Sequence, residues 1–173
     1  FYLSDHGDYG GERGLLSKIP WIPFDDLARV PFFMAGANVP RGRTVDLPVQ
    51  TFDFVPTALG MANITFPYAG YDSVDLRTYF TNEGERLANR PIISETQMGF
   101  PMVLRGQIKD IWHNHTDTHL LYDLANDPEE RFNVANNPKY RELMAENAAL
   151  LLEVLRCDIF PVAFSTSAPT APK

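Results

Sequence analysis

The chain has 173 residues, 45% of them hydrophobic, and a formal net charge of −7. This length and composition are sufficient for one folded domain with a hydrophobic core. The negative charge argues against nucleic acid and against anionic membrane surfaces as partners. The sequence contains no apolar run of about 18 residues, so we expect no transmembrane helix. A single cysteine excludes an intrachain disulfide and does not indicate a compartment, so localisation stays open.

The first zone, residues 1–66, has the pattern of an α/β sheet edge. Residues 1–3 are apolar and predict the end of a buried strand. Residues 27–35 form an almost continuous apolar run, which predicts a strand that is buried on both faces. Residues 50–62 repeat apolar side chains at helical spacing and predict a helix, in which Pro56 is tolerable only in the first turns.

The rest of the chain predicts a connector and a second, smaller unit. Residues 67–90 are the connector, with a short helix at 74–80. Residues 91–160 predict a small antiparallel sheet closed by a helix. The expected strands are 91–95, 102–105, 107–112 and 118–124.

The last helix begins at Asn137-Pro138, because Asn caps a helix and Pro suits its first position, and it continues to residue 156. Residues 161–173 are small, polar and Pro-rich, and we expect a flexible tail. The predicted fold class is therefore α/β, or α+β for this chain alone. It combines the edge of a large α/β sheet with a small antiparallel sheet packed against a C-terminal helix.

Asp5 and His6 follow the first predicted strand and are candidate metal ligands. Carboxylate oxygen and imidazole nitrogen both bind divalent cations. Adjacent residues of a regular strand point to opposite faces, so the two side chains can converge on one ion only where the strand ends. Gly7 permits a sharp turn there, and ligands of open α/β sheets gather beyond the carboxyl ends of strands. Taken alone, the segment is also typical of a simple turn.

Further motifs follow this segment in a fixed order. They are Ser4-Asp5-His6-Gly7, Gly11-Glu12-Arg13-Gly14-Leu15, Lys18, Phe24-Asp25-Asp26, Arg29-Val30-Pro31, the segment 36–48, Asp53 with Pro56-Thr57-Ala58-Leu59, Ser94-Glu95, Leu121-Tyr122-Asp123-Leu124, Asp127-Pro128-Glu129-Glu130 and Asn133-Val134-Ala135. In type and spacing they resemble the C-terminal signature of the sulfatases, a branch of the alkaline phosphatase superfamily. The resemblance covers about residues 1–156 and implies that residues 1–66 are the C-terminal part of a sulfatase-type α/β catalytic domain.

The resemblance implies an enzyme longer than this chain. A sulfatase nucleophile lies near the N-terminus in a Cys/Ser-x-Pro/Ala-x-Arg motif and is converted to formylglycine. The one cysteine here, Cys157, does not fit that motif, and the upstream aspartates of the metal site are also missing. We therefore expect a sulfate ester as the substrate, the missing N-terminal part of the catalytic domain as a partner, and no activity from this chain alone.

The resemblance also assigns Asp5 and His6 to a divalent cation, most often calcium in sulfatases. His6 departs from the sulfatases that have asparagine at this place, and an imidazole favours manganese or zinc. Phosphonate monoester hydrolases of the same superfamily also show Asp-His, so a phosphonate monoester hydrolase or phosphodiesterase is an alternative. A non-catalytic fragment that acts as a binding or folding module is an alternative of another class.

Lys18 is the predicted catalytic residue and a predicted substrate ligand. The resemblance places it against the sulfate, where it offsets charge on the departing oxygen; such a cation contributes roughly 10²–10³-fold in rate. An exposed, solvated lysine is the alternative. Arg13 in the Gly-rich loop is a second candidate substrate ligand, with a structural salt bridge as the alternative. Asp25 and Asp26 match the family's paired acids at a helix start and are expected to be structural.

Residues 113–119 contain three histidines at even spacing with Asp117 among them. On one continuous strand the side chains of His113, His115 and His119 would share a face and could bind zinc. Asn114 and Asp117 are turn formers, however, and favour a hairpin tip with exposed histidines. A contact between this loop and the substrate is a further alternative.

Overall fold

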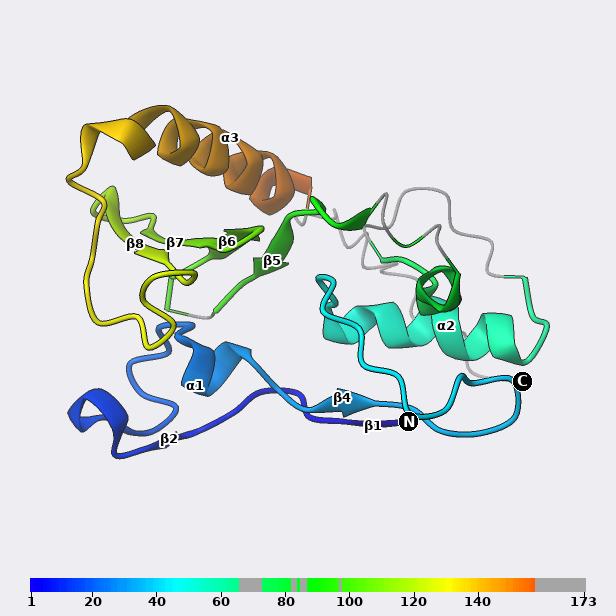
Figure 1. Ribbon diagram of the computed structural model, residues 1–173. Helices are drawn as coiled ribbons and strands as arrows, with labels where there is room; N and C mark the ends of the chain where they lie inside the picture. Colours follow the sequence, from blue (N-terminus) through cyan, green and yellow to red (C-terminus); the bar gives the residue numbers. More distant parts are fainter. Residues whose placement is uncertain (66–72, 82–83, 85–86, 97, 158–173) are drawn as a thin grey trace, which may run out of the picture.

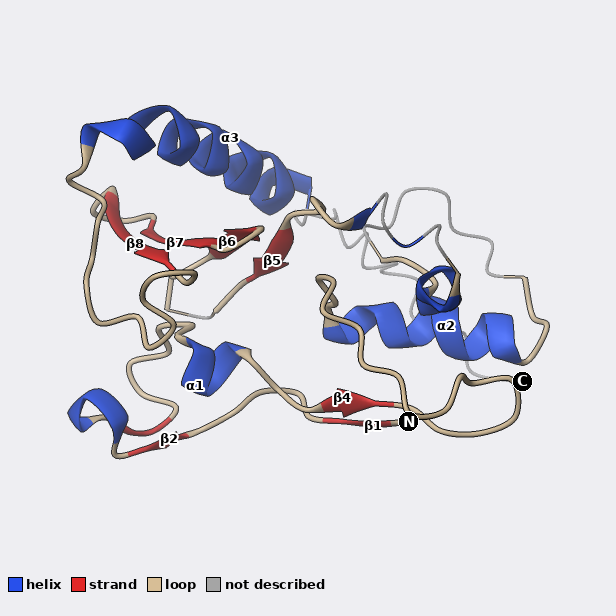
Figure 2. Cartoon of the chain, in the orientation of Figure 1, coloured by secondary structure: helices blue, strands red, loops and turns tan. Residues whose placement is uncertain are grey.

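The computed structural model describes residues 1–65, 73–81, 84, 87–96 and 98–157. Part of the predicted connector and the whole predicted tail therefore lie outside the described residues. The main unit is a four-stranded antiparallel sheet with the C-terminal helix on one face and the segment 9–28 on the other (Figures 1 and 2). This mixed architecture confirms the predicted fold class. No helix in the described ranges has the length and apolar character needed to cross a bilayer.

The N-terminal elements are short. Strand β1 (Tyr2–Leu3) pairs antiparallel with β4 (Phe32–Phe33), and the rings of Tyr2 and Phe33 stack with centroids 4.7 Å apart. Strands β2 (Tyr9–Gly10) and β3 (Leu16–Ser17) form a hairpin with the 3-10 turn η1 (Glu12–Gly14) at its tip. The Gly-rich loop of the sequence is therefore this hairpin.

The strand predicted over residues 27–35 is wrong for most of its length. Helix α1 (Asp25–Ala28) occupies its start, and only β4 is extended in a sheet. A short apolar run does not distinguish a buried strand from a buried helix. The start of α1 is capped from far along the chain, because Glu130 Oε2 accepts a hydrogen bond from the Asp25 N–H at 2.9 Å. The predicted helix start at the paired acids is confirmed, with Asp25 and Asp26 in the first turn of α1.

The helix predicted over residues 50–62 is confirmed as the 3-10 turn η2 (Thr51–Asp53) followed by α2 (Phe54–Met61). Asp53 is fully buried and organises this region. Its carboxylate accepts from the N–H groups of Gln50 and Val74 and forms an ion pair with Arg90 at 2.5 Å. The expected helix at 74–80 is the 3-10 helix η3 (Leu76–Phe80).

The four-stranded sheet has the order β5-β6-β7-β8. Its strands are β5 (Ile92–Ser94), β6 (Met102–Arg105), β7 (Ile108–His113) and β8 (Thr118–Asp123), close to the predicted ranges. Gly106 has a φ of 57° in the tight turn between β6 and β7, a conformation that glycine adopts without steric cost. All neighbouring strands are antiparallel, so each connection is a hairpin or a longer loop between adjacent strands.

Side chains alternate between the two faces of this sheet, and each face packs into its own hydrophobic cluster. Val103 and Trp112 point to one face and pack with Leu151 of helix α3 (Arg141–Cys157). The opposite face contributes part of a larger cluster formed by Tyr9, Phe24, Leu27, Ile92, Met102, Ile111 and Tyr122. This second cluster joins the N-terminal hairpin and α1 to the sheet. The turn η5 (Pro138–Tyr140) leads into α3, and Asn137 caps it by accepting from the Lys139 N–H, as predicted.

Candidate functional site

The segment that carries Asp5 and His6 leaves β1 and packs against α1. The Gly7 N–H donates to the Leu27 carbonyl at 2.8 Å. A Cβ at Gly7 would lie only 2.0 Å from the Asp26 carbonyl oxygen. The sequence suggested Gly7 for a sharp turn, but its φ is not in the left-handed region that the chain's other strained glycines occupy. What the position requires is the absence of a side chain, so that α1 can approach the backbone.

Asp5 and His6 converge at this point. Asp5 Oδ2 lies 3.4 Å from His6 Nε2, and 84% of the Asp5 side chain and 31% of the His6 side chain are exposed. His6 Nδ1 lies 2.9 Å from the Gly7 carbonyl oxygen. Because a carbonyl can only accept, Nδ1 is the ring nitrogen that carries the proton in the neutral tautomer, and Nε2, beside Asp5 Oδ2, is left as the possible ligand atom.

This geometry fits a shared cation. Two ligand atoms that are each about 2.1 Å from one ion lie about 3.0–3.5 Å apart. The His6 N–H donates to Asp5 Oδ1 at 3.0 Å, and this hydrogen bond lowers the pKa of Asp5, which keeps the carboxylate ionised. Among the residues that the structure describes, no group of three or more His, Cys, Asp or Glu side chains could hold a metal. Asp5 and His6 therefore stay two candidate ligands, and a complete cation site would require further ones.

Lys18 lies in a turn that ends at Trp21. The Trp21 N–H donates to the Lys18 carbonyl at 2.6 Å, across a cis Ile19–Pro20 peptide bond. Lys18 Nζ lies 5.8 Å from the centroid of the Trp21 ring, and the ring of His6 meets the same indole edge-on at 6.3 Å. The fold thus brings Lys18 and His6 to one side chain. Sequence reasoning missed Trp21, because nothing in the local pattern distinguishes it from a core aromatic residue.

Arg13, the second candidate substrate ligand, is engaged by protein groups. Its guanidinium donates to the carbonyl oxygens of Glu129 and Glu130 at 2.7 and 2.8 Å. It also forms ion pairs with Glu130 at 3.2 Å and Asp26 at 3.5 Å, and it lies 4.1 Å from the centroid of the Phe24 ring. These contacts are those of the structural alternative. A contact between Arg13 and substrate stays a prediction.

A buried ion network lies behind α1. Lys109 Nζ lies 2.6 Å from Glu130 Oε1 and 2.8 Å from Asp25 Oδ1, and only 1% of the Lys109 and Glu130 side chains is exposed. Burial of these charges is tolerable because each one has an opposite partner. The network fixes α1, and α1 in turn supports Gly7 and the two candidate ligands. The Asp-Pro-Glu-Glu motif was visible in the sequence, but its partner on strand β7 was not.

The histidine segment forms the hairpin tip that turn chemistry predicted, between β7 and β8. His115 is exposed as predicted, whereas His113 is half-buried and stacks on Phe100 with ring centroids 4.6 Å apart. His119 differs from the expectation, because 85% of its side chain is covered and its Nδ1 lies 2.8 Å from Asp110 Oδ1. That hydrogen bond raises the pKa of His119. Within the described residues the three histidines do not form a metal site.

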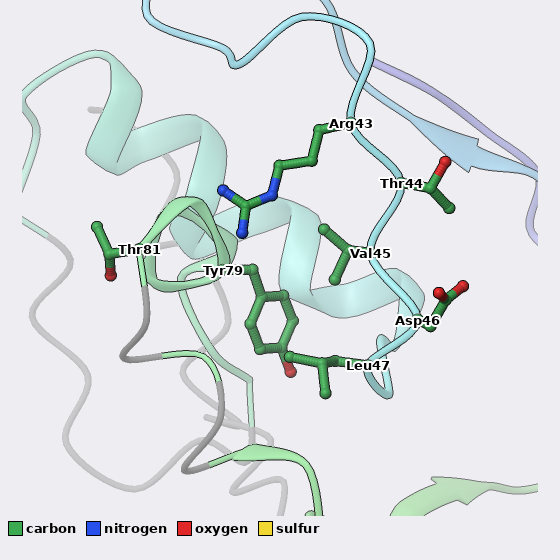
Figure 3. A pocket seen from close by; sticks show the side chains of 7 residues that line it. All are labelled: Arg43, Thr44, Val45, Asp46, Leu47, Tyr79 and Thr81. Carbon is green, nitrogen blue, oxygen red and sulfur yellow. The ribbon is translucent and has the colours of Figure 1, made fainter.

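The structure also contains a pocket of about 250 Å³ away from the predicted site residues (Figure 3). It is lined by Arg43, Thr44, Val45, Asp46, Leu47, Tyr79 and Thr81. Figure 3 shows Arg43 reaching from the extended segment 43–47 towards η3, where its guanidinium donates to the Phe80 carbonyl at 3.0 Å. None of the candidate metal, catalytic or substrate residues lines this pocket, so it gives no support to the predicted site.

Known proteins resemble this chain as follows. No family model matches it. It is 31% identical to a Delta 4,5-hexuronate-2-O-sulfatase of Bacteroides thetaiotaomicron over 86% of this chain and 33% of that protein. It is 27% identical to an arylsulfatase of Clostridium perfringens over 89% of this chain and 33% of that protein. The solved structure of a 2-O GAG sulfatase superposes with a TM-score of 0.74 and 29% identity, over 90% of this chain and 35% of that one. The chain spans about a third of the length of the curated relatives it matches.

Proposed function

Since this chain is homologous to part of a sulfatase, we propose that the protein containing it hydrolyses sulfate esters. The observation that carries the proposal is the convergence of Asp5 and His6 beside the indole that Lys18 contacts. Residues 1–66 would then belong to the catalytic domain, and residues 91–160 would form the smaller unit that supports it. The overall reaction cleaves the bond between sulfur and the ester oxygen with water and releases an alcohol and sulfate.

Asp5 and His6 are proposed to hold a divalent cation through Oδ2 and Nε2. The bound cation would bind a sulfate oxygen and lower the charge that opposes nucleophilic attack. The Gly7 carbonyl keeps His6 in the required tautomer. Carboxylate oxygen alone would suit calcium, whereas the imidazole favours manganese or zinc. The remaining ligands and the nucleophile, a formylglycine, would come from protein outside this chain.

Lys18 is proposed to contact the sulfate and to offset the negative charge that develops on the departing oxygen. Its ammonium has the chemistry for this role, because a lysine side chain ends in a compact cation with three N–H donors. Arg13 would act mainly through structure, since it connects the Gly-rich hairpin to Glu130.

The proposal is tested with the full-length protein and its Asp5→Asn variant. We expect bound divalent metal, measured by inductively coupled plasma mass spectrometry, and turnover of an aryl sulfate to fall sharply together. Asp8→Asn is the matched control, because Asp8 is an exposed acid in the same segment. Unchanged metal content and unchanged kcat in Asp5→Asn would remove Asp5 from the site.

One observation favours a second candidate function. An imidazole ligand is a feature shared with phosphonate monoester hydrolases, so the same experiment includes an aryl phosphonate monoester. A higher kcat/KM for the phosphonate than for the sulfate would favour this alternative. Absence of turnover with both esters in metal-loaded full-length protein would favour the non-catalytic module. The isolated 173-residue chain should hydrolyse neither ester.

A further inference from the structure

Lys18 and His6 contact the same indole ring. Lys18 Nζ is 5.8 Å from the Trp21 ring centroid, which is within the range of a cation–π interaction. The His6 ring meets that indole edge-on, with centroids 6.3 Å apart. We infer that Trp21 is a positioning residue, which holds the Lys18 ammonium beside His6 and leaves its charge available to an anion. The inference rests on the proposed function and extends it to a residue that belongs to none of the sulfatase-like motifs.

The chemistry of the contact supports this role. Arg13, Arg90 and Lys109 all pair with carboxylates. In the described part of the chain, no carboxylate lies within salt-bridge distance of Lys18. A carboxylate would neutralise the ammonium and would repel an incoming sulfate. An indole attracts the cation through its π face and carries no formal charge, so the field of Lys18 still reaches an anion.

Trp21 is suited to hold a partner because its own position is fixed. Its side chain is half-buried and packs against the cluster that contains Tyr9, Phe24 and Leu27. Its φ is 67°, which is uncommon for a bulky residue and persists only where the surroundings determine the backbone. Its N–H closes the turn on the Lys18 carbonyl. Backbone and side chain of Trp21 therefore restrain the same lysine.

The first test is structural and needs no activity. The chain contains four lysines, Lys18, Lys109, Lys139 and Lys173, and reductive methylation with ¹³C-formaldehyde gives each reactive one an NMR signal while keeping its charge. The Lys18 signal, assigned by its loss in Lys18→Arg, should be displaced by the ring current of Trp21. Trp21→Leu should abolish this displacement, and Trp21→Phe should retain part of it. Lys139 is the internal control, because its Nζ lies 4.4 Å from the Tyr140 ring centroid and should not respond.

The second test measures whether the Lys18 ammonium binds an anion. Inorganic sulfate, titrated at constant ionic strength against chloride, should shift the Lys18 signal of the methylated chain that has Trp21. In Trp21→Leu the affinity for sulfate should be about fivefold weaker. In the full-length protein the same variant should lower kcat for an aryl sulfate by about fivefold, and Trp21→Phe should restore most of the loss.

An identical Lys18 signal in the original chain and in Trp21→Leu would overturn the inference. So would a kcat loss in Trp21→Leu that Trp21→Phe does not relieve, because that result is expected from damaged packing alone. If Trp21 controls the Lys18 signal and sulfate binding while the full-length protein turns over no sulfate ester, the inference stands and the proposed function fails.

Discussion

Glu130 Oε1 lies 2.6 Å from Lys109 Nζ, and the two side chains are almost completely buried between the four-stranded sheet and α1. Glu130 also supplies the cap that begins α1, through the hydrogen bond from the Asp25 N–H to Oε2. One side chain therefore provides a charge partner for the sheet and a helix cap for the segment that supports the candidate site. Through these two contacts Glu130 connects the four-stranded sheet to α1.

Glu130→Gln should destabilise the chain by about 3 kcal/mol, because it leaves Lys109 buried with one fewer opposite charge. The free energy of unfolding from urea titration measures this loss. Glu129→Gln is the matched control, since the exposed Glu129 carboxylate forms an ion pair with a side chain that is itself exposed, that of Arg131. We expect the control to change the free energy by less than about 0.5 kcal/mol.

A double-mutant cycle measures the interaction between Lys109 and Glu130 separately from their contacts with other residues. Lys109→Met combined with Glu130→Gln should be less destabilising than the sum of the single changes, by at least about 1 kcal/mol, because neither charge is then left alone. Strict additivity of the two changes would show that Lys109 and Glu130 do not interact, in conflict with the structure.

Gly7→Ala tests the close approach of α1 to the candidate ligands. The new methyl group would meet the Asp26 carbonyl oxygen at 2.0 Å, so α1 or the Asp5-His6 segment must move. We expect a loss of about 1–3 kcal/mol in the free energy of unfolding, together with weaker metal binding in the full-length protein. Gly10→Ala is the control, because its methyl group would lie 3.4 Å from the mobile end of Glu12. Equal stability of both variants would contradict the observed packing.

We expect the free energy of unfolding to depend on pH through His119. Its hydrogen bond to Asp110 raises its pKa in the folded chain above the ordinary value of 6.5, so the folded state keeps a proton that the unfolded state loses. The stabilisation is fully present below that ordinary pKa and is lost as pH rises through the raised pKa. Asp110 and Asp117 face the ring and both favour its charged form, and Asn147 on α3 donates to Asp110.

Urea titrations between about pH 6 and pH 8.5 measure this effect. The free energy of unfolding should fall more steeply with rising pH in the original chain than in His119→Asn. His115→Asn is the control, because His115 is exposed at the hairpin tip, and it should keep the original slope. Parallel pH profiles for the original chain and His119→Asn would show that His119 titrates alike in both states.

The elements that the sequence predicted well have local signals. Gly106 marks the turn between β6 and β7, and Asn137 with Pro138 marks the start of the last helix. Each of these signals acts within a few residues, so it can be read without the fold. The same holds for Asp5 and His6, whose position at the end of a strand follows from the local pattern and the family resemblance.

The features that the sequence did not predict depend on distant partners. The apolar run over residues 27–35 suggested a strand, but its first two residues belong to α1, whose Asp25 N–H donates to Glu130 far along the chain. His119 is covered where its ring pairs with Asp110 and stacks on Trp112, both on the neighbouring strand β7. Trp21 meets both Lys18 Nζ and the His6 ring, which lies 15 residues earlier in the chain, and this proximity is visible only in the folded structure. In each case a contact in three dimensions outweighs the local propensity.

The proposed role of Lys18 in the hydrolysis of a sulfate ester is tested by kcat and KM of Lys18→Ala in the full-length protein. A lysine that acts mainly in the transition state should lower kcat by about 10²-fold or more, with less effect on KM. An activated aryl sulfate should lose less than an alkyl sulfate, because its leaving oxygen carries charge more easily. Lys139→Ala, which removes another lysine held over an aromatic ring, should leave both esters unaffected. If kcat and KM of Lys18→Ala stay within about twofold of the original values for both esters, Lys18 is a solvated surface residue and the proposed site is wrong at its catalytic position.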